Sequence, residues 1–265
     1  MQNEKNTVSA EYIKNNLKTE YIGKDFYYFD EVSSTFDIAE NIPIKSGTVI
    51  YAKKQTNGRG RLGRSWESEE GGIYFSIILV PDMSFEEIHI MTALCAVGIK
   101  RAVSSYLPCK IKWPNDIVSE DGKKICGILT KLRYDGNNKA VINVGIGINA
   151  NTKSFDKELK YASSISLITG KDASEGDILC RVLEEIESCC NPKTISKIMD
   201  EYKKDCITLG KRVRVIYAND DKSIIGLCKD INRDGSLSVE TDEGETLSVT
   251  SGEVSVRGIY GESYV

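Results

Sequence analysis

The chain has 265 residues, with 35 Lys or Arg against 39 Asp or Glu, so its formal net charge is −4. Hydrophobic residues make up 40% and charged residues 28%, which is typical of soluble globular proteins with one large domain or two unequal ones. No apolar run approaches the ~20 residues of a membrane helix, and the polar first residues lack a signal-peptide core. A general nucleic-acid binder should be basic, and this chain is mildly acidic, so we expect no nucleic-acid partner. From the missing membrane helix and signal peptide, we expect a cytoplasmic protein without a membrane partner.

The eight cysteines are scattered along the chain and form no C-x-x-C pair, and His89 is the only histidine. This pattern indicates reduced thiols rather than a disulfide framework. It also lacks the ligand spacing of a structural zinc site. We therefore predict no protein-bound metal centre.

The first third of the chain predicts alternating strands and helices. Aromatic and β-branched residues indicate strands over residues 25–32, 48–54 and 72–80. Ser33-Ser34-Thr35 offers caps for a helix over residues 36–40. Ser84 and Glu87 form a capping box, from which a longer amphipathic helix should run to about Ser105.

The middle of the chain predicts a short strand over residues 110–113 and a hairpin. The hairpin strands cover residues 125–134 and 140–149, on either side of the turn Asp135-Gly136-Asn137-Asn138. Ser174 with Asp177 caps the next predicted helix, and Asn191-Pro192 starts another, with proline at the first helical position.

After Leu209-Gly210 the pattern changes to short alternating strands. Turn signals separate them at Asn219-Asp220, Arg233-Asp234-Gly235 and Glu243-Gly244. This predicts a small all-β domain, barrel-like by the spacing of its strands. The chain should therefore divide into a larger domain over residues 1–208 and a smaller one over residues 209–265.

The most informative segment is Gly58-Arg59-Gly60-Arg61-Leu62-Gly63-Arg64. Its glycines leave the backbone free, and its arginines supply forked donors that match carboxylates and phosphates. Such a loop should be mobile when empty and should close over an anion. It lacks the Lys-Ser/Thr of a phosphate-binding P-loop. The alternative is a solvated basic loop or an arginine-glycine nucleic-acid tail, which the acidic composition disfavours.

Two further segments could carry chemistry. In Lys112-Trp113-Pro114-Asn115-Asp116, followed by Lys123-Lys124, charged side chains lie between buried strands, where they could neutralise a phosphate and orient a nucleophile. A turn with a surface ion pair is an equally good interpretation of that segment alone. In Val144-Gly145-Ile146-Gly147-Ile148-Asn149, glycines within a strand indicate the close approach of a ligand or of another chain segment.

Taken in order, these segments resemble the biotin protein ligase family, the biotin–acetyl-CoA-carboxylase ligases. The resemblance rests on Ser-Ser-Thr, Gln-x-x-Gly-Arg-Gly-Arg-x-Gly-Arg, Lys-Trp-Pro-Asn-Asp, Lys-x-x-Gly-Ile-Leu and Gly-x-Gly-Ile-Asn. It implies an α+β fold, in which a mixed sheet packed with helices precedes a small SH3-like β-barrel. The residues before the first predicted strand are too few for the DNA-binding domain of regulatory members, so we expect the catalytic-only type.

The resemblance also implies the reaction. Biotin would attack the α-phosphate of ATP to give biotinyl-AMP, with Mg²⁺ assisting. A lysine of a biotin carboxyl carrier protein, from acetyl-CoA carboxylase or a related carboxylase, would then displace AMP. Family members include dimers and monomers, so a homodimer stays open.

Residue roles follow by position within the family motifs. The biotin-binding residues would be Ser34, Thr35, Gln55, Gly58, Arg59, Lys124, Gly127, Ile128, Leu129 and Gly145. The nucleotide-binding residues would be Arg59, Arg61, Arg64, Trp66, Lys112, Asn115 and Asn149. Lys124, Asp116 and Arg59 would be catalytic. Lys124 would bridge the two reacting anions, and Lys123 is its rival in the alignment.

The chain departs from the family at two positions. Phe36 stands where Asn, Met or Gln is usual, and Leu62 stands where some members have another arginine. Two other functions are compatible with the motifs: a lipoate or octanoate ligase or transferase of the same superfamily, and a non-catalytic biotin sensor. Related transferases use a cysteine nucleophile, but core packing is the preferred interpretation of Cys126.

Overall fold

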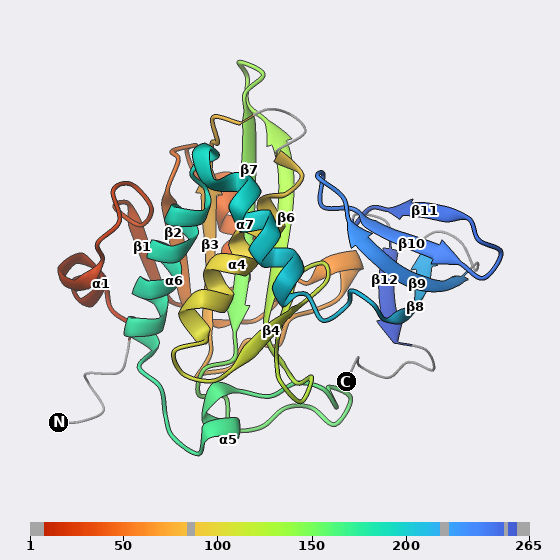
Figure 1. Ribbon diagram of the computed structural model, residues 1–265. Helices are drawn as coiled ribbons and strands as arrows, with labels where there is room; N and C mark the ends of the chain where they lie inside the picture. Colours follow the sequence, from red (N-terminus) through yellow and green to blue (C-terminus); the bar gives the residue numbers. More distant parts are fainter. Residues whose placement is uncertain (1–7, 84–87, 218–222, 252–253, 259–265) are drawn as a thin grey trace.

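The computed structural model describes residues 8–83, 88–217, 223–251 and 254–258, and its larger part is built on one mixed seven-stranded sheet (Figure 1). The strand order is β1 (Phe26–Val32), β2 (Thr48–Gln55), β3 (Ile73–Leu79), β7 (Ala140–Ile148), β6 (Lys124–Tyr134), β5 (Asp116–Ser119) and β4 (Cys109–Lys112). Strands β1 and β2 pair in parallel, and every other pair is antiparallel. The predicted mixed sheet is confirmed.

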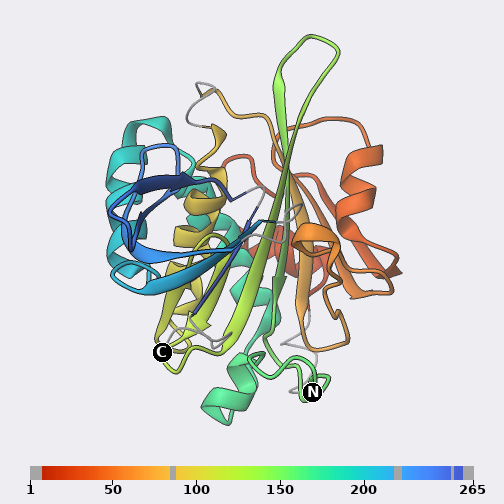
Figure 2. The same ribbon diagram turned by 90° about the vertical axis from the view of Figure 1, so that its right-hand side faces the viewer.

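Helices cover the two faces of this sheet unequally. The helices on one face are α4 (Met91–Val103), α6 (Glu175–Cys189) and α7 (Ile195–Asp205), while α2 (Thr35–Asn41) lies on the other (Figure 2). Two short helices, α1 (Ala10–Asn16) and α5 (Ile165–Thr169), lie at the periphery. Every residue of β3 is buried, as expected for a central strand covered on both faces. Beside α2, however, no helix among the described residues covers the second face, and the site described below lies there.

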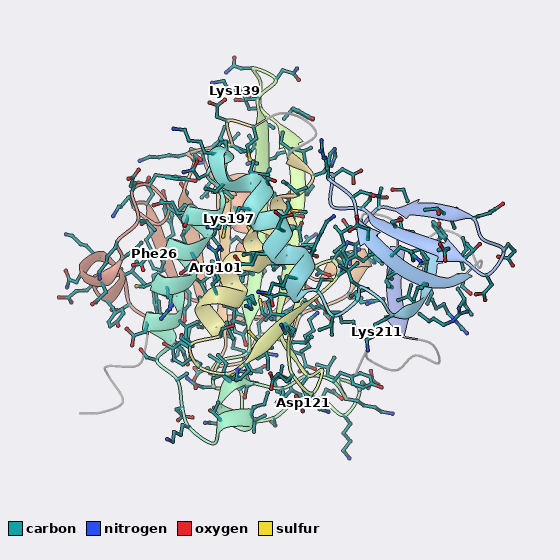
Figure 3. The ribbon with its side chains drawn as sticks, viewed as in Figure 1. Phe26, Arg101, Asp121, Lys139, Lys197 and Lys211 are labelled. Carbon is teal, nitrogen blue, oxygen red and sulfur yellow. The ribbon has the colours of Figure 1, made fainter. Side chains whose placement is uncertain are left out.

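The three packed helices are joined by one arginine. Arg101, labelled on α4 in Figure 3, binds Glu201 of α7. Its Nε lies 2.9 Å from Oε1 and its Nη2 lies 2.5 Å from Oε2. Its Nη1 also lies 3.4 Å from Oε2 of Glu185 on α6. A planar guanidinium with several donors can satisfy two carboxylates at once, so Arg101 fixes the packing of all three helices.

Several element boundaries differ from the sequence predictions. The long helix begins at Met91, and the expected capping box at residues 84–87 lies outside the described residues. Asn191-Pro192 opens only a 3-10 turn (Pro192–Thr194) before α7 begins at Ile195. The sequence did not predict strand β5, because Pro114 indicates the end of the preceding strand and hides the start of the next one. The Ser174 cap is confirmed, since its side chain accepts from the N–H of Asp177.

The C-terminal part forms a five-stranded antiparallel sheet. Its order is β11 (Thr246–Val249), β10 (Leu237–Thr241), β9 (Ser223–Ile231), β8 (Arg212–Tyr217) and β12 (Val254–Gly258). The expected turn at Asn219-Asp220 lies outside the described residues. Closure of this sheet into a barrel and the domain boundary at residue 209 stay predictions. None of the helices in the described ranges has both the length and the apolarity that crossing a membrane requires.

The two sheets are joined through the Lys-Trp-Pro-Asn-Asp segment. The indole Nε1 of Trp113 donates to the carbonyl of Gly235 at 3.0 Å, and the Trp113 N–H donates to Thr208 Oγ1 at 3.1 Å. Tyr202 Oη donates to the Pro114 carbonyl at 3.2 Å. The segment that leads into β5 is therefore held by both parts of the molecule.

Candidate active site

A cavity of about 220 Å³ lies on the helix-poor face of the seven-stranded sheet. Residues from all five sequence motifs meet in its walls. Those that the sequence predicted are Ser34, Thr35, Gln55, Arg59, Arg61, Arg64, Trp66, Lys112, Asn115, Asp116, Lys124, Gly127, Ile128, Leu129 and Gly145. Those that it did not predict are Phe36, Gly60, Ser65, Trp113, Pro114, Ile146, Gly147 and Val256.

The floor of the cavity is made of glycines on two paired strands. Gly127 on β6 pairs with Gly147 on β7, and Gly145 lies two residues back along β7. A Cβ atom at Gly127 would lie 2.7 Å from Trp66 Cζ3, and one at Gly147 would overlap the same indole. Glycine is required at both positions because the ring lies directly on the sheet. Gly147 is the second glycine of the Gly-x-Gly motif, and this position in the sequence could have predicted that it lines the cavity.

Lys124 and Asp116 form an ion pair beside this floor. Lys124 Nζ lies 2.7 Å from Asp116 Oδ1 and 5.0 Å from the centre of the Trp66 ring. Their pairing depends on a β-bulge: Asp116 faces Gly127, but Val118 faces Lys124, so Ile125 is an extra residue on β6. A bulge reverses the alternation of side chains, and here it turns Lys124 toward the cavity.

Asn149 and Gly58 lie behind the walls. The amide of Asn149 is 4% exposed and donates to the carbonyl of Ser163 at 3.0 Å and to that of Lys124 at 3.4 Å. It therefore braces the backbone of the cavity lysine, and an adenine contact by this side chain stays a prediction. Gly58 packs against Trp66 and Ser68, because a Cβ there would overlap the Trp66 carbonyl oxygen and lie 2.6 Å from Ser68 Oγ.

Polar side chains gather at the end of the cavity next to α2. The amide oxygen of Gln55 accepts from the N–H of Thr35 at 2.9 Å and from its hydroxyl at 3.1 Å. Gln55 Nε2 donates to Ser68 Oγ at 2.8 Å. Ser34, at the N-cap of α2, makes no capping hydrogen bond, contrary to prediction, and its buried hydroxyl has no partner among the described residues. A buried hydroxyl without a partner is costly, so it marks a position where a ligand atom would be stabilised.

The glycine-arginine segment forms a flap, here defined as residues 57–67, at the mouth of the cavity. Arg59 binds Asp37 on α2, with Nε 2.7 Å from Oδ1 and Nη2 2.9 Å from Oδ2. Leu62, at the tip, has φ 56° and ψ 40°, which is the left-handed region. A non-glycine residue there costs about 1–3 kcal/mol, and such strain favours alternative conformations of the tip.

Arg61 links the flap to both sheets. Its Nη1 donates to Asn115 Oδ1 at 3.1 Å, and its Nη2 donates to the carbonyl of Ser251, next to β11. Burial lowers the pKa of Arg61, although the nearby Asp116 opposes that shift. A guanidinium stays charged even so. A permanent cation is therefore held between the flap, the Lys-Trp-Pro-Asn-Asp segment and the C-terminal sheet.

Cys126 belongs to the hydrophobic core and does not line the cavity. Its side chain is fully buried, and burial raises the pKa of the thiol well above its usual range. Because the thiolate is the nucleophilic form, this cysteine has the properties of a packing residue, as expected.

Comparison with known proteins agrees with the motifs and the geometry. Residues 28–149 match the biotin/lipoate A/B protein ligase family, and residues 208–257 match the biotin protein ligase C terminal domain. The bifunctional ligase/repressor BirA of Bacillus subtilis is 32% identical over 254 residues, which covers 89% of this chain and 76% of that protein. The chain belongs to the biotin protein ligase family.

Other members of the biotin protein ligase family support the assignment. The biotin–[acetyl-CoA-carboxylase] ligase of Mycobacterium tuberculosis is 25% identical over 222 residues, covering 78% of each chain. The biotin protein ligase from Aquifex aeolicus, solved in complex with biotin and ATP, has a TM-score of 0.77 and 31% identity. That match covers 89% of this chain and 99% of the Aquifex chain, so it includes both sheets.

Proposed function

We propose that this chain activates biotin with ATP and transfers it to a lysine side chain of a carboxylase's carrier protein. The observation that carries the proposal is the meeting of Lys124, Asp116 and the arginine flap over one glycine-floored cavity. Biotin is a carboxylic acid and lacks a good leaving group. ATP supplies one, so the protein needs no nucleophile of its own.

In the first step, an oxygen of the biotin carboxylate would bond to the α-phosphorus of ATP while the bond to pyrophosphate breaks. Two unit anions ~4 Å apart repel by about 4 kcal/mol at an effective dielectric constant of ~20. Lys124 would offset that repulsion, and Arg59, Arg61 and Arg64, which line the same cavity, would add positive charge. The unpartnered Ser34, with Thr35 and Gln55, would hold the polar head of biotin.

In the second step, the lysine amine of the carrier protein would attack the acyl carbon, and AMP would leave. Asp116 lines the same cavity, and its carboxylate would orient the incoming amine and take up its proton. Asp116 would first have to break its ion pair with Lys124, in which Lys124 Nζ lies 2.7 Å from Asp116 Oδ1.

Mg²⁺ would enter with ATP rather than occupy a site made by the protein. Within the described part of the chain, no group of three or more His, Cys, Asp or Glu side chains is arranged to hold a metal ion. Magnesium bound through substrate phosphates, with few protein ligands, is common in enzymes that use ATP. Its contribution would be to offset phosphate charge.

The test is ATP–pyrophosphate exchange, measured with biotin present and absent. We expect exchange that depends on biotin and, with a biotin carrier domain added, incorporation of biotin into that domain. Absence of exchange would favour the biotin-sensor alternative. Titration calorimetry with biotin and lipoate separates the remaining alternative, because tighter binding of lipoate would indicate a lipoate-handling enzyme.

A further inference from the structure

We infer that Phe36 is a depth stop that sets how far an acid substrate enters the cavity, and so selects the length of its aliphatic chain. The inference rests on the proposed function, because it concerns the same cavity. It extends that function by assigning a role to one of the two residues at which this chain departs from the family pattern.

The phenyl ring of Phe36 is buried and forms a wall of the cavity. Its side chain lines the cavity and is only 6% exposed, yet it belongs to neither cluster of packed core residues among those described. A Cβ atom at Gly145 would lie 2.8 Å from Phe36 Cδ2. The ring is therefore fitted against a bare stretch of β7, in the same way that Trp66 is fitted against Gly127 and Gly147.

The position of this ring is fixed by α2 and the neighbouring strands. The buried side chain of Asn143 on β7 donates from Nδ2 to the Phe36 carbonyl at 2.9 Å. Lys131 on β6 pairs with Glu40 of α2, with Nζ 2.7 Å from Oε1. Because both contacts tie α2 to the central strands, the backbone that carries the ring cannot withdraw without breaking a buried hydrogen bond.

The glycine floor gives the cavity a direction. Gly145, beside Phe36, and Gly147, beside Trp66, are two residues apart on β7, which corresponds to about 7 Å along the strand. Lys124 lies at the Trp66 end, where its Nζ would be 3.2 Å from a Cβ at Gly127. An acid whose carboxylate reaches Lys124 therefore directs its other end toward Phe36. The distance between the ring and Lys124 fixes the length of chain that brings the carboxylate to the cation.

The test compares biotin with homobiotin, whose side chain is one methylene longer, in ATP–pyrophosphate exchange. In an apolar pocket one methylene changes kcat/KM by about 10- to 200-fold. We expect the unchanged protein to prefer biotin within that range. Phe36→Val removes the stop, so the longer acid can enter deeper, and the preference for biotin should fall at least tenfold. Phe36→Leu, which keeps more of the volume, should give an intermediate preference and guards against a valine variant that does not fold.

The matched control is Phe29→Val. Phe29 packs beside α2 in the smaller core cluster and does not line the cavity, so its replacement should leave the preference unchanged. An unchanged preference in a folded Phe36→Val protein would overturn the depth stop, as would an unchanged protein that treats both acids alike.

Calorimetry measures the dissociation constants of biotin and homobiotin, and their ratio gives the preference between the two acids without any reaction taking place. If biotin binds but no exchange occurs, the proposed ligase activity fails while this ratio still decides the depth stop. A protein that binds neither acid overturns both.

Discussion

At the scale of single residues, the site depends on which of two adjacent lysines faces the cavity. Lys124 lines the cavity and pairs with Asp116, whereas Lys123 Nζ donates to the Lys160 carbonyl at 3.2 Å and lies 5.9 Å from the centre of the Tyr161 ring. The sequence offered both residues as candidates. The bulge at Ile125 turns the side chain of Lys124, and not that of Lys123, toward the cavity. The geometry therefore supports Lys124 as the residue that bridges the reacting anions.

Replacing Lys124 with alanine should lower biotin-dependent ATP–pyrophosphate exchange by about 10²- to 10³-fold, the usual loss when one preorganised charge stabiliser is removed. Lys123→Ala is the matched control, because it removes the same charge one residue away, outside the cavity. It should retain nearly full exchange. A Lys124→Ala protein with a near-normal rate would contradict the assignment, and so would equal losses in the two variants.

At the scale of elements, the sheet and its helices provide a rigid frame, and the flap is the part built to change. Arg101 joins α4, α6 and α7 through Glu185 and Glu201. In the flap, by contrast, Leu62 adopts a strained left-handed conformation and Arg59 is held by an exposed ion pair. Weak local restraints of this kind are typical of segments that open at little free-energy cost.

The Arg101–Glu201 pair predicts a pH-dependent contribution to stability. The hydrogen bonds from Arg101 lower the pKa of Glu201 below its ordinary value of 4.5. The stabilisation is therefore complete above pH 4.5 and is lost as the pH falls through the lower, folded-state pKa. Glu201→Gln should reduce the free energy of unfolding by about 1.5–3 kcal/mol at neutral pH, and this difference should shrink in acid. Urea denaturation at several pH values measures it.

The control for that series is Asp200→Asn, which removes a charge from the exposed face of the same helix. We expect a change within about 0.5 kcal/mol at neutral pH. A Glu201→Gln protein whose destabilisation persists undiminished in strong acid would show that the ion pair is not its cause.

The flap predicts a change in hydrogen exchange on ligand binding. When an anion takes over Arg59 from Asp37, closure of the flap should slow amide exchange across residues 57–67. The comparison is between the free protein and the protein saturated with biotinyl-AMP, with the amides of β3 as an internal reference. Exchange in the flap that is the same in both states would argue against closure.

At the scale of the whole molecule, the two sheets meet at the site. Arg61 reaches Asn115 and the Ser251 carbonyl, Trp113 reaches the Gly235 carbonyl, and Val256 of β12 lines the cavity. The C-terminal sheet therefore contributes to the wall of the cavity and touches the flap. A movement of the flap would therefore also change the contact between the seven-stranded sheet and the C-terminal sheet.

Arg61→Ala should loosen that contact as well as weaken nucleotide binding. We expect the amides of residues 246–251 to exchange faster in this variant, because the hydrogen bond to Ser251 is lost. Arg59→Ala removes an equal charge from the same flap, but its partner is Asp37 on α2, so those amides should be unaffected. Faster exchange in both variants, or in neither, would contradict a specific role for Arg61.

The sequence by itself determined most of the residues that line the cavity and the order of the motifs that contain them. Most of the motif residues line the cavity because each has a local reason to be where it is: glycines permit close approach, and arginines match anions. Most individual strands of both sheets also followed from local periodicity, whereas the mixed sheet was what the family resemblance implied.

Only the tertiary structure decided how those residues meet. It placed Phe36 against Gly145 as a wall, used Asn149 to brace a backbone carbonyl, and chose Lys124 over Lys123 through one inserted residue on β6. It also joined Arg61 to Ser251, which lies 190 positions later in the chain. These outcomes depend on strand register and on contacts between distant segments, and a local pattern of residue types contains neither.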